Sequence, residues 1–348
     1  MNKNFKQWLF ILAMVLLLFC LIFIFEEQDS LQPSNFPLRQ NWTAKLNARI
    51  LNISVSPHGN IIVQTSSMLY SLDAKTGETL WKYDLSWQGS AKSPCFNNNA
   101  VYLVNHGLLL SINEQSGRLM WKQPLPRTNE WVTDASEKVV LVNQVSEYIV
   151  AFDANTGKYL WQQPADRGEI QAYIDNDVVY IPGYSMRSFD WLTGIALWSN
   201  DDLRTPGYVA YKDGVLYSLA GAYDLRNHKE VWQSASFTKG IVRFTVIDET
   251  VFIMDSEYIC AKRVQDGTLR WCSNIQYGQI PSILNKVVYI FNGNHRKITA
   301  ANLLTGDSIG DLVIVNMNIF TIDNQLMAAS SEKLYFSSGS TIFAFGQK

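Results

Sequence analysis

The sequence predicts an all-β protein, an eight-bladed β-propeller of four-stranded antiparallel blades preceded by one N-terminal transmembrane helix. Three observations predict this fold: an uncharged apolar run near the N-terminus, a motif that recurs about every 40 residues after it, and two pairs of short strand patterns in each repeat. Four strands in a repeat of about 40 residues are typical of propeller blades.

The composition excludes several classes of protein. Aromatic residues make up 13% and charged residues only 17% of the 348 residues, so the chain has enough apolar material for a core and is not a disordered protein. The net charge is −2 and the chain has no long basic run, which argues against nucleic-acid binding. The four cysteines form neither a CxxC motif nor a Cys/His cluster, so we expect no zinc site.

The first element is the apolar run over residues 8–25, which is as long as a membrane-spanning helix. Lys3 and Lys6 precede it and acidic residues follow it, so the positive-inside rule places residues 1–7 in the cytoplasm and the rest of the chain outside it. We therefore expect a single-pass signal anchor in the cell membrane. Cleavage of the segment as a signal peptide and lipidation at Cys20 are the alternatives.

Residues 26–39 contain two prolines and several polar residues and are interpreted as a short linker. The propeller is expected over residues 40–348. This places the propeller in the periplasm or at the cell surface.

The repeat is defined by an Asp or Asn, a Thr/Ser-Gly pair three and four residues later, and a Trp four residues after the Gly. It is clearest at Asp73 to Trp81, Asn113 to Trp121 and Asp153 to Trp161, and weaker copies follow. Tryptophans keep this phase through most of the chain, and Gly310 stands where the last one is due. The tryptophans in phase are Trp42, Trp81, Trp121, Trp161, Trp198, Trp232 and Trp271.

Each copy of the motif predicts a β-hairpin. The alternating strand over residues 68–72 is followed by Asp73, which can accept backbone N–H groups, and by Gly77, which can take the positive φ of a bulged turn. A second pair of strands precedes each hairpin, with turns such as 176–177 and 212–214 between them. Each repeat therefore contains four strands.

The ends of the chain predict how the ring closes. Residues 340–345 form a third-strand pattern with no motif after it, and the segment around Trp42 is a fourth-strand pattern with no blade before it. We expect these two strands to pair and to close an eight-bladed ring, because closure removes the exposed edges of an open array.

The motif resembles that of the pyrroloquinoline-quinone (PQQ) repeat family of β-propellers, also called quinoprotein-like. The motif of that family is Ala-x-Asp-x-x-Thr-Gly-x-x-x-Trp. Residues 151–161 and 71–81 match it best, and the resemblance covers residues 40–348. It implies that the seven tryptophans each dock on the motif of the next blade, with the indole N–H on a backbone acceptor. The glycines that would receive them are Gly77, Gly117, Gly157, Gly194 and Gly306. At Gly310, where a docking tryptophan is due, the resemblance implies that the contact with the next blade is weaker or is made by another residue.

The family has two branches that imply different functions. Its quinoprotein dehydrogenases bind PQQ and calcium, are considerably longer, and many of them carry an adjacent Cys-Cys pair that this chain lacks. Its BamB-like branch consists of bare propellers that bind protein partners without a quinone. Size and the missing Cys-Cys pair favour the second branch, which implies a non-catalytic, monomeric scaffold without a cofactor. A PQQ- and Ca-dependent dehydrogenase and a cell-surface sensor of carbohydrate or peptide remain the alternatives.

We expect no catalytic, cofactor-binding or metal-binding residue in this chain. The four histidines fall in four different turns, two on each rim of the predicted propeller, so we interpret them as solvated turn residues. They are His58, His106, His228 and His295.

The cysteines suggest one possible disulfide. If Ala261 faces Trp271 across its hairpin, then Cys260 faces Cys272, and an oxidising compartment would allow a cross-strand bridge. Cys95 is expected to be a free thiol in a strand.

A candidate partner-binding surface comes from loops expected on one face of the ring. Basic residues recur there in four consecutive blades with tryptophans nearby, and Arg and Trp are frequent at binding hot spots. Glu130, Glu169, Asp201 and Asp202 dilute this charge, so ordinary solvated loops are the alternative. The candidate residues are Arg127, Arg167, Arg204, Lys239, Trp87 and Trp131.

Overall fold

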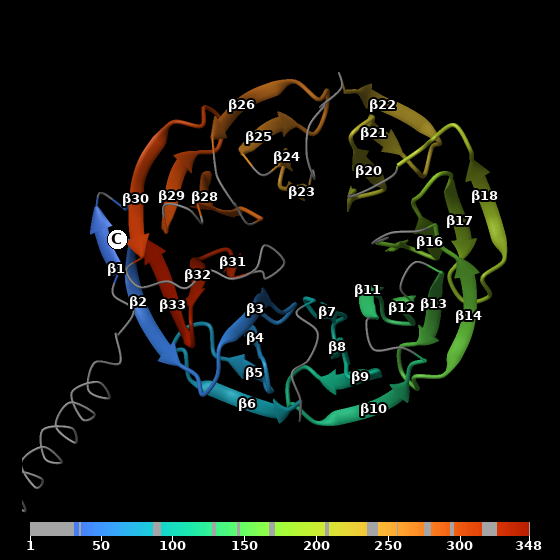
Figure 1. The fold of residues 1–348 in the computed structure, drawn as a ribbon, viewed down its shortest axis with the longest axis horizontal. Helices are drawn as coiled ribbons and strands as arrows, with labels where there is room; N and C mark the ends of the chain where they lie inside the picture. The colour runs from blue at the N-terminus through green and yellow to red at the C-terminus, as the bar shows by residue number, and fades with distance from the viewer. Residues whose placement is uncertain are drawn as a thin grey trace, which may run out of the picture.

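The computed structural model describes residues 31–34, 36–85, 92–126, 130–144, 147–166, 171–205, 209–234, 243–255, 257–274, 280–292, 296–314 and 326–347. In these residues the strands form eight antiparallel sheets arranged as the blades of a closed ring (Figure 1). The first strand of each blade lies nearest the centre and the fourth lies on the circumference (Figure 1). The structure thus confirms the eight-bladed propeller predicted from the repeat.

The first four blades follow one another along the chain as simple meanders. Blade 1 contains β3 (Ile50–Val55), β4 (Ile61–Thr65), β5 (Met68–Leu72) and β6 (Thr79–Asp84). Blade 2 contains β7 (Cys95–Phe96), β8 (Ala100–Asn105), β9 (Leu108–Asn113) and β10 (Leu119–Pro124). Blade 3 contains β11 (Trp131–Ala135), β12 (Val139–Gln144), β13 (Tyr148–Asp153) and β14 (Tyr159–Pro164). Blade 4 contains β15 (Tyr173–Asp175), β16 (Val178–Ile181), β17 (Met186–Asp190) and β18 (Ala196–Asn200).

The remaining blades complete the ring. Blade 5 contains β19 (Ala210–Lys212), β20 (Val215–Ser218), β21 (Gly221–Asp224) and β22 (Lys229–Gln233). Blade 6 contains β23 (Arg243–Ile247), β24 (Thr250–Met254), β25 (Tyr258–Arg263) and β26 (Leu269–Asn274). Blade 7 contains β27 (Ser282–Leu284), β28 (Val287–Asn292), β29 (Lys297–Asn302) and β30 (Ser308–Ile314). Blade 8 contains β31 (Met327–Ala329), β32 (Lys333–Ser338), β33 (Thr341–Gln347) and β2 (Leu38–Lys45).

The core lies between the blades. Every residue of β8 is buried, and β24 is buried throughout, because both faces of the inner strands pack against neighbouring blades. This explains why the second strands are nearly continuous apolar runs rather than alternating ones. One apolar cluster, for example, joins Leu141 and Ile149 of blade 3 to Val179 and Ile181 of blade 4.

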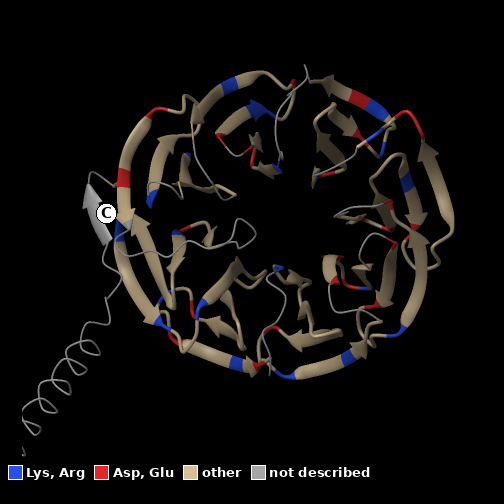
Figure 2. Ribbon diagram, viewed as in Figure 1, with Lys and Arg blue, Asp and Glu red and all other residues tan. Residues whose placement is uncertain are grey.

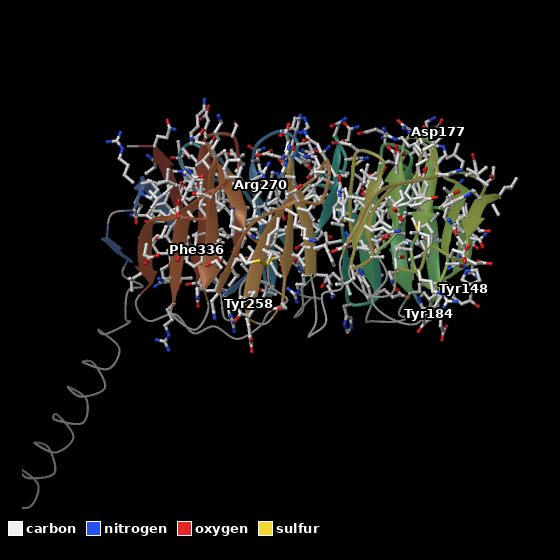
Figure 3. All side chains as sticks on the ribbon, turned by 90° about the horizontal axis from the view of Figure 1, so that it is seen from above. Tyr148, Asp177, Tyr184, Tyr258, Arg270 and Phe336 are labelled. Carbon is white, nitrogen blue, oxygen red and sulfur yellow. A yellow bond between two sulfur atoms is a disulfide. The ribbon has the colours of Figure 1, made fainter. Side chains whose placement is uncertain are left out.

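The ring has two different faces. One face, called here the turn face, carries the turns between first and second strands and between third and fourth strands, and Asp177 marks it (Figure 3). The opposite face, called here the loop face, carries the connections between second and third strands, where Tyr148, Tyr184 and Tyr258 lie (Figure 3). Both signs of charge are spread around the described part of the ring (Figure 2).

The ring closes as the sequence predicted. β2 pairs antiparallel with β33, and Trp42 lies opposite Ala344. Blade 8 therefore takes its outer strand from the beginning of the chain and its other three strands from the end.

The N-terminal part of the propeller differs from the expected linker over residues 26–39. β1 (Leu31–Ser34) pairs antiparallel with β30, with Leu31 opposite Ile314, and makes blade 7 five-stranded. The outer edge of β30 supplies the pairing partner, which a local sequence pattern of four residues cannot reveal.

The predicted membrane segment over residues 8–25 and the stub over residues 1–7 lie outside the described residues. Within the residue ranges given above, no helix has the length and apolar character that crossing a membrane requires.

Candidate functional site

The motif tryptophans lie between neighbouring blades. Six of them donate their indole N–H to the carbonyl oxygen of the first residue inside the next blade's motif turn, at 2.7 to 3.2 Å. The shortest of these bonds joins Trp81 to Glu114 and the longest joins Trp42 to Ala74. The other four run from Trp121 to Ala154, from Trp161 to Trp191, from Trp232 to Val264 and from Trp271 to Leu303. Each large ring is thus buried or half-buried while keeping its one hydrogen bond.

The motif glycines receive these rings, and two constraints select glycine there. At Gly157 the backbone φ is +71°, a left-handed conformation that is unfavourable for residues with a side chain. A Cβ atom at that position would also lie 2.5 Å from the Trp121 ring. Gly77, Gly117, Gly194, Gly267 and Gly306 show the same pair of constraints.

Blade 5 solves this contact differently. His228 stands where the motif glycine is due and adopts a φ of 55°. Its imidazole stacks on the Trp198 ring of blade 4, with centroids 4.3 Å apart and an angle of 8° between the planes. The histidine interpreted as a solvated turn residue is therefore part of a contact between blades.

Position 310 shows how the eighth contact is made. Gly310 lies opposite Ala300 in the register that the docking tryptophans occupy elsewhere. Blade 8 has no motif turn to receive a ring, because its third and fourth strands come from opposite ends of the chain. Phe36, which is 1% exposed, packs there against Tyr289 of blade 7 and Phe345 of blade 8.

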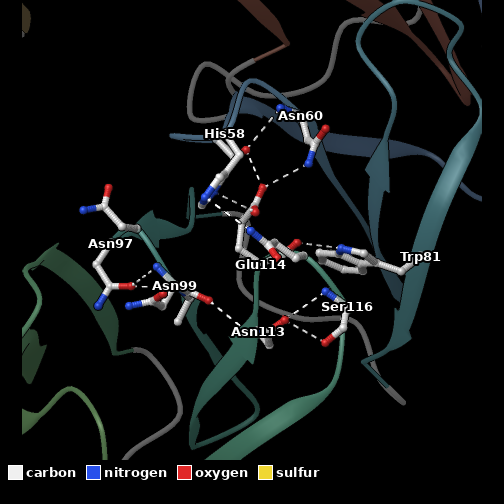
Figure 4. A network of polar contacts seen from close by, with 12 residues as sticks. His58, Asn60, Trp81, Asn97, Asn99, Asn113, Glu114 and Ser116 are labelled. Carbon is white, nitrogen blue, oxygen red and sulfur yellow. Dashed lines mark hydrogen bonds and ion pairs between the residues drawn. The ribbon is translucent and has the colours of Figure 1, made fainter.

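A polar network joins blades 1 and 2 at the turn face (Figure 4). Glu114 is completely buried, and its carboxylate accepts hydrogen bonds from Ser56 Oγ at 2.5 Å and from Asn60 Nδ2 at 3.3 Å. His58 Nδ1 lies 3.0 Å from the other carboxylate oxygen. The repeat gave no sign of this network, because other copies of the motif have Ala74 or Ala154 at the position of Glu114.

A second charged contact joins blades 4 and 5. The Arg226 side chain donates to both carboxylate oxygens of Asp175, with Nη2 at 2.6 Å from Oδ1. These bonds from the Arg226 guanidinium hold the pKa of Asp175 below its ordinary value. Both polar contacts connect blades at the turn face, and neither was predicted from the sequence.

The candidate partner-binding residues are only partly within the described chain. Arg127, Arg167, Lys239 and Trp87 lie outside the described residues. Arg204 is exposed. Trp131 is half-buried at the start of β11, and Lys92 Nζ lies 5.0 Å above its ring.

Blade 4 holds a firmly bonded loop on the loop face. Gly183 and Thr205 exchange hydrogen bonds, with Thr205 N–H donating to Gly183 O at 2.8 Å and Gly183 N–H donating to Thr205 Oγ1 at 3.1 Å. Asp166 accepts the N–H of Tyr184 at 2.5 Å. The loop therefore presents Tyr184, whose surface is 64% exposed, and the neighbouring Arg204 from a fixed backbone.

Two half-buried titratable groups near the centre, Asp134 and Cys95, have structural partners. Asp134 on β11 accepts the N–H of Ile174 on the neighbouring blade and the N–H of Ala135, both at 2.8 Å. Burial nevertheless raises the pKa of Asp134 to about 6. Burial also raises the pKa of the Cys95 thiol, which makes it a poor nucleophile.

The described residues contain no group of three or more His, Cys, Asp or Glu side chains that could hold a metal ion. Of the histidines, His106 is a turn residue with a φ of 50°, and His295 lies outside the described residues. Cys260 and Cys272 lie opposite each other on β25 and β26 and form a disulfide.

Comparison with known proteins agrees with this architecture. The family model described as outer membrane protein assembly factor BamB matches residues 39–123 and 105–218, together more than half of the chain. BamB of Burkholderia pseudomallei is 28% identical over 235 residues, which are 62% of this chain and 58% of that protein. The chain thus covers less than two thirds of the length of the curated relatives that it matches.

Solved structures show the same fold. BamB from Moraxella catarrhalis superposes with a TM-score of 0.66 and 14% identity, over 89% of this chain and 99% of that one. Quinohemoprotein alcohol dehydrogenase from Comamonas testosteroni gives a TM-score of 0.63 and 12% identity, over 89% of this chain and 76% of the enzyme. On the evidence of the family model, the chain belongs to the PQQ-repeat propeller family described as outer membrane protein assembly factor BamB.

Proposed function

We propose that this protein is a non-catalytic scaffold that binds a protein partner through its loop face, outside the cytoplasm and anchored by residues 8–25. The observation that carries the proposal is the blade 4 loop with its exposed Tyr184 and Arg204. Tyrosine and arginine at a fixed position are frequent binding hot spots, because little side-chain freedom is lost when the partner binds.

Two further observations support parts of this proposal. The Cys260–Cys272 disulfide suits an oxidising compartment outside the cytoplasm, as the charge asymmetry around residues 8–25 also does. Membership of the BamB family supports a role in assembly with other proteins.

Photo-cross-linking in membranes tests the scaffold role. A photoreactive residue in place of Leu203, beside Arg204, should capture a discrete protein, and Arg204→Glu combined with Tyr184→Ala should reduce the yield at least tenfold. Arg263→Glu on the turn face is the matched control, because its side chain is similarly exposed. Equal yields from both variants, or no captured protein, would contradict the proposal.

The rival function is a PQQ- and Ca-dependent dehydrogenase. Reconstitution of the purified full-length protein with both cofactors should give neither a bound quinone spectrum nor alcohol-dependent dye reduction. A saturable quinone spectrum with dye reduction would replace the scaffold proposal with an enzymatic one.

A further inference from the structure

The outer strands of the blades are the edges of the eight sheets. Closure joins the blades into a ring, but the fourth strand of a blade still has one row of backbone N–H and C=O groups that faces away from its sheet (Figure 1). β1 shows that such an edge accepts another strand, because it pairs antiparallel with the outer edge of β30. An extended segment can therefore add to an outer edge of this propeller.

Seven of the eight outer strands that the structure describes carry a feature that opposes such pairing. Charged side chains and prolines protect edge strands, because a charge is costly to bury and a proline has no N–H to donate. Six of the seven contain at least one charged residue, namely β2, β6, β10, β22, β26 and β30. β14 ends with Pro164 instead. β18 (Ala196–Asn200) has neither a charged residue nor a proline.

The edge of β18 is also apolar. Ile195, which directly precedes the strand, is 65% exposed, and Leu197 is 54% exposed. The Trp198 ring stacks on His228 of blade 5 and leaves these two side chains on the outside. Within the described residues, β17 is the only strand that pairs with β18. The edge thus offers backbone hydrogen-bonding groups beside apolar surface, the combination that an added strand uses.

Two carboxylates lie at the end of this edge. β18 ends at Asn200, and the next two residues, Asp201 and Asp202, are both exposed. The exposed Arg204 follows, so negative charge exceeds positive charge in this group. A strand that pairs antiparallel with β18 brings its N-terminal end to these carboxylates, where a Lys or Arg side chain complements them.

The edge of β18 is continuous with the loop that we propose to bind the partner. The chain runs from β18 through residues 201–204 to Thr205, which exchanges hydrogen bonds with Gly183 beside Tyr184. A partner held by the loop of blade 4 can therefore reach the outer edge of the same blade.

A second copy of this chain complements the edge less well than another protein does. Antiparallel pairing of two β18 strands places Asp201 and Asp202 of one copy beside the start of β18 in the other. The residues before that start, Gly194 and Ile195, offer no cation.

We propose that the outer edge of β18 binds an extended strand of the protein partner by antiparallel pairing. That strand has apolar side chains against Ile195 and Leu197, and a Lys or Arg at its N-terminal end against Asp201 and Asp202. This inference rests on the proposed protein-binding function and adds the kind of segment that the partner contributes.

A short peptide, Lys-Lys-Val-Thr-Val-Thr-Val with a C-terminal fluorophore, is the probe. Bound to the full-length protein, it should slow amide hydrogen exchange over residues 195–200 and leave residues 159–164 of β14 unchanged. Peptides with prolines in place of both threonines, or with glutamates in place of both lysines, should bind at least tenfold more weakly in fluorescence anisotropy. Equal affinity of either control peptide, or unchanged exchange over residues 195–200, would overturn the proposal.

Ser199→Lys tests the same edge in the protein. Ser199 is exposed and directly follows Trp198, and blades 1 and 2 carry Lys82 and Lys122 at this position, so the fold accepts a lysine there. The variant should weaken peptide binding at least tenfold. Gln162→Lys is the matched control at the same position of β14, where the side chain is also exposed, and should leave binding unchanged. Equal peptide affinities of the two variants would contradict a site on β18.

Partner capture separates this inference from the scaffold proposal. With the photoreactive residue at Leu203, Ser199→Lys should reduce the yield at least tenfold and Gln162→Lys should not. An unchanged yield with Ser199→Lys would overturn the edge site and leave the scaffold function standing. No captured protein, with residues 195–200 still protected by the peptide, would contradict the scaffold function alone. A covalent dimer of this chain from a photoreactive residue in place of Leu197 would make a second copy the occupant and overturn the proposal.

Discussion

Phe36 packs edge-on against Tyr289, with the ring centroids 5.7 Å apart. Trp121 packs at a similar distance on Tyr102 of its own blade, and Trp42 does so on Tyr335, both at 5.9 Å and with tilted rings. A residue from the segment between β1 and β2 thus occupies the place of the missing eighth tryptophan. Closure of the ring depends on this segment as well as on the pairing of β2 with β33.

Replacement of Phe36 should destabilise the ring at this junction. A buried phenylalanine truncated to alanine typically costs about 3–5 kcal/mol, so Phe36→Ala should lower the melting temperature by several degrees. Tyr159→Ala, at a residue whose surface is 54% exposed, is the control and should have little effect. Similar melting temperatures for both variants would refute the role of Phe36.

The packing of a tryptophan on the motif glycine predicts that alanine substitution destabilises the protein by different amounts at two glycines that share a positive φ. Gly59 has a φ of +84°, and a Cβ added there would meet no heavy atom within 4 Å, whereas a Cβ at Gly157 would meet the Trp121 ring. Gly59→Ala should cost only the backbone strain of about 1–2 kcal/mol. Gly157→Ala should cost clearly more in urea unfolding, and equal costs would show that the ring can move aside.

Asp134 should give an unusual pH dependence of stability. Its pKa in the folded protein is about 6, above the ordinary 3.8, because burial disfavours the charged form. The folded state therefore holds the proton more tightly, so this stabilising contribution is complete below about pH 4 and is lost as the pH rises to about 6. The loss amounts to at most about 3 kcal/mol.

Asp134→Asn is the variant that isolates this effect. Thermal melts of wild type and variant from pH 4 to 6.5 should differ by an amount that changes in favour of the variant as the pH rises. The bonds from Ile174 and Ala135 can also change in the variant, but this adds an offset that is independent of pH. A difference that stays constant across the range would contradict the raised pKa.

The disulfide predicts a defined pattern of thiol reactivity. Alkylation of the unfolded, unreduced protein should label Cys20 and Cys95 but neither Cys260 nor Cys272, as peptide mass analysis can show. Reduction or Cys272→Ser should destabilise the protein by about 2–3 kcal/mol, because a short loop is released. Cys95→Ala provides the control for loss of a half-buried thiol, and labelling of all four cysteines would exclude the disulfide.

Much of the propeller architecture could be predicted from the sequence, because each repeat contains the residues that determine its own hairpin. An Asp or Asn opens a turn, a glycine takes a positive φ, and a tryptophan follows at fixed spacing, so blade number, hairpin register and the pairing of the two ends were all predictable. The same register placed Cys260 opposite Cys272. Such features depend on residues a few positions apart or on the count of repeats.

The contacts that the sequence did not predict join residues that are far apart in the chain. Glu114 meets His58, His228 stacks on Trp198, and Phe36 reaches blades 7 and 8. In each case the residue departs from the repeat, so the motif gives no information about its partner.

The sequence alone was therefore sufficient to predict the eight-bladed architecture of this protein. The reason is that each hairpin is determined by residues close together in the chain, and the number of hairpins determines the number of blades. The side chains that pack between the blades could be identified only in the folded molecule. The same is true of the hydrogen bonds that hold the loop with Tyr184 next to the predicted Arg204. The physical reason is that burial and hydrogen-bond satisfaction are properties of the space between segments, and that space exists only after the ring has closed.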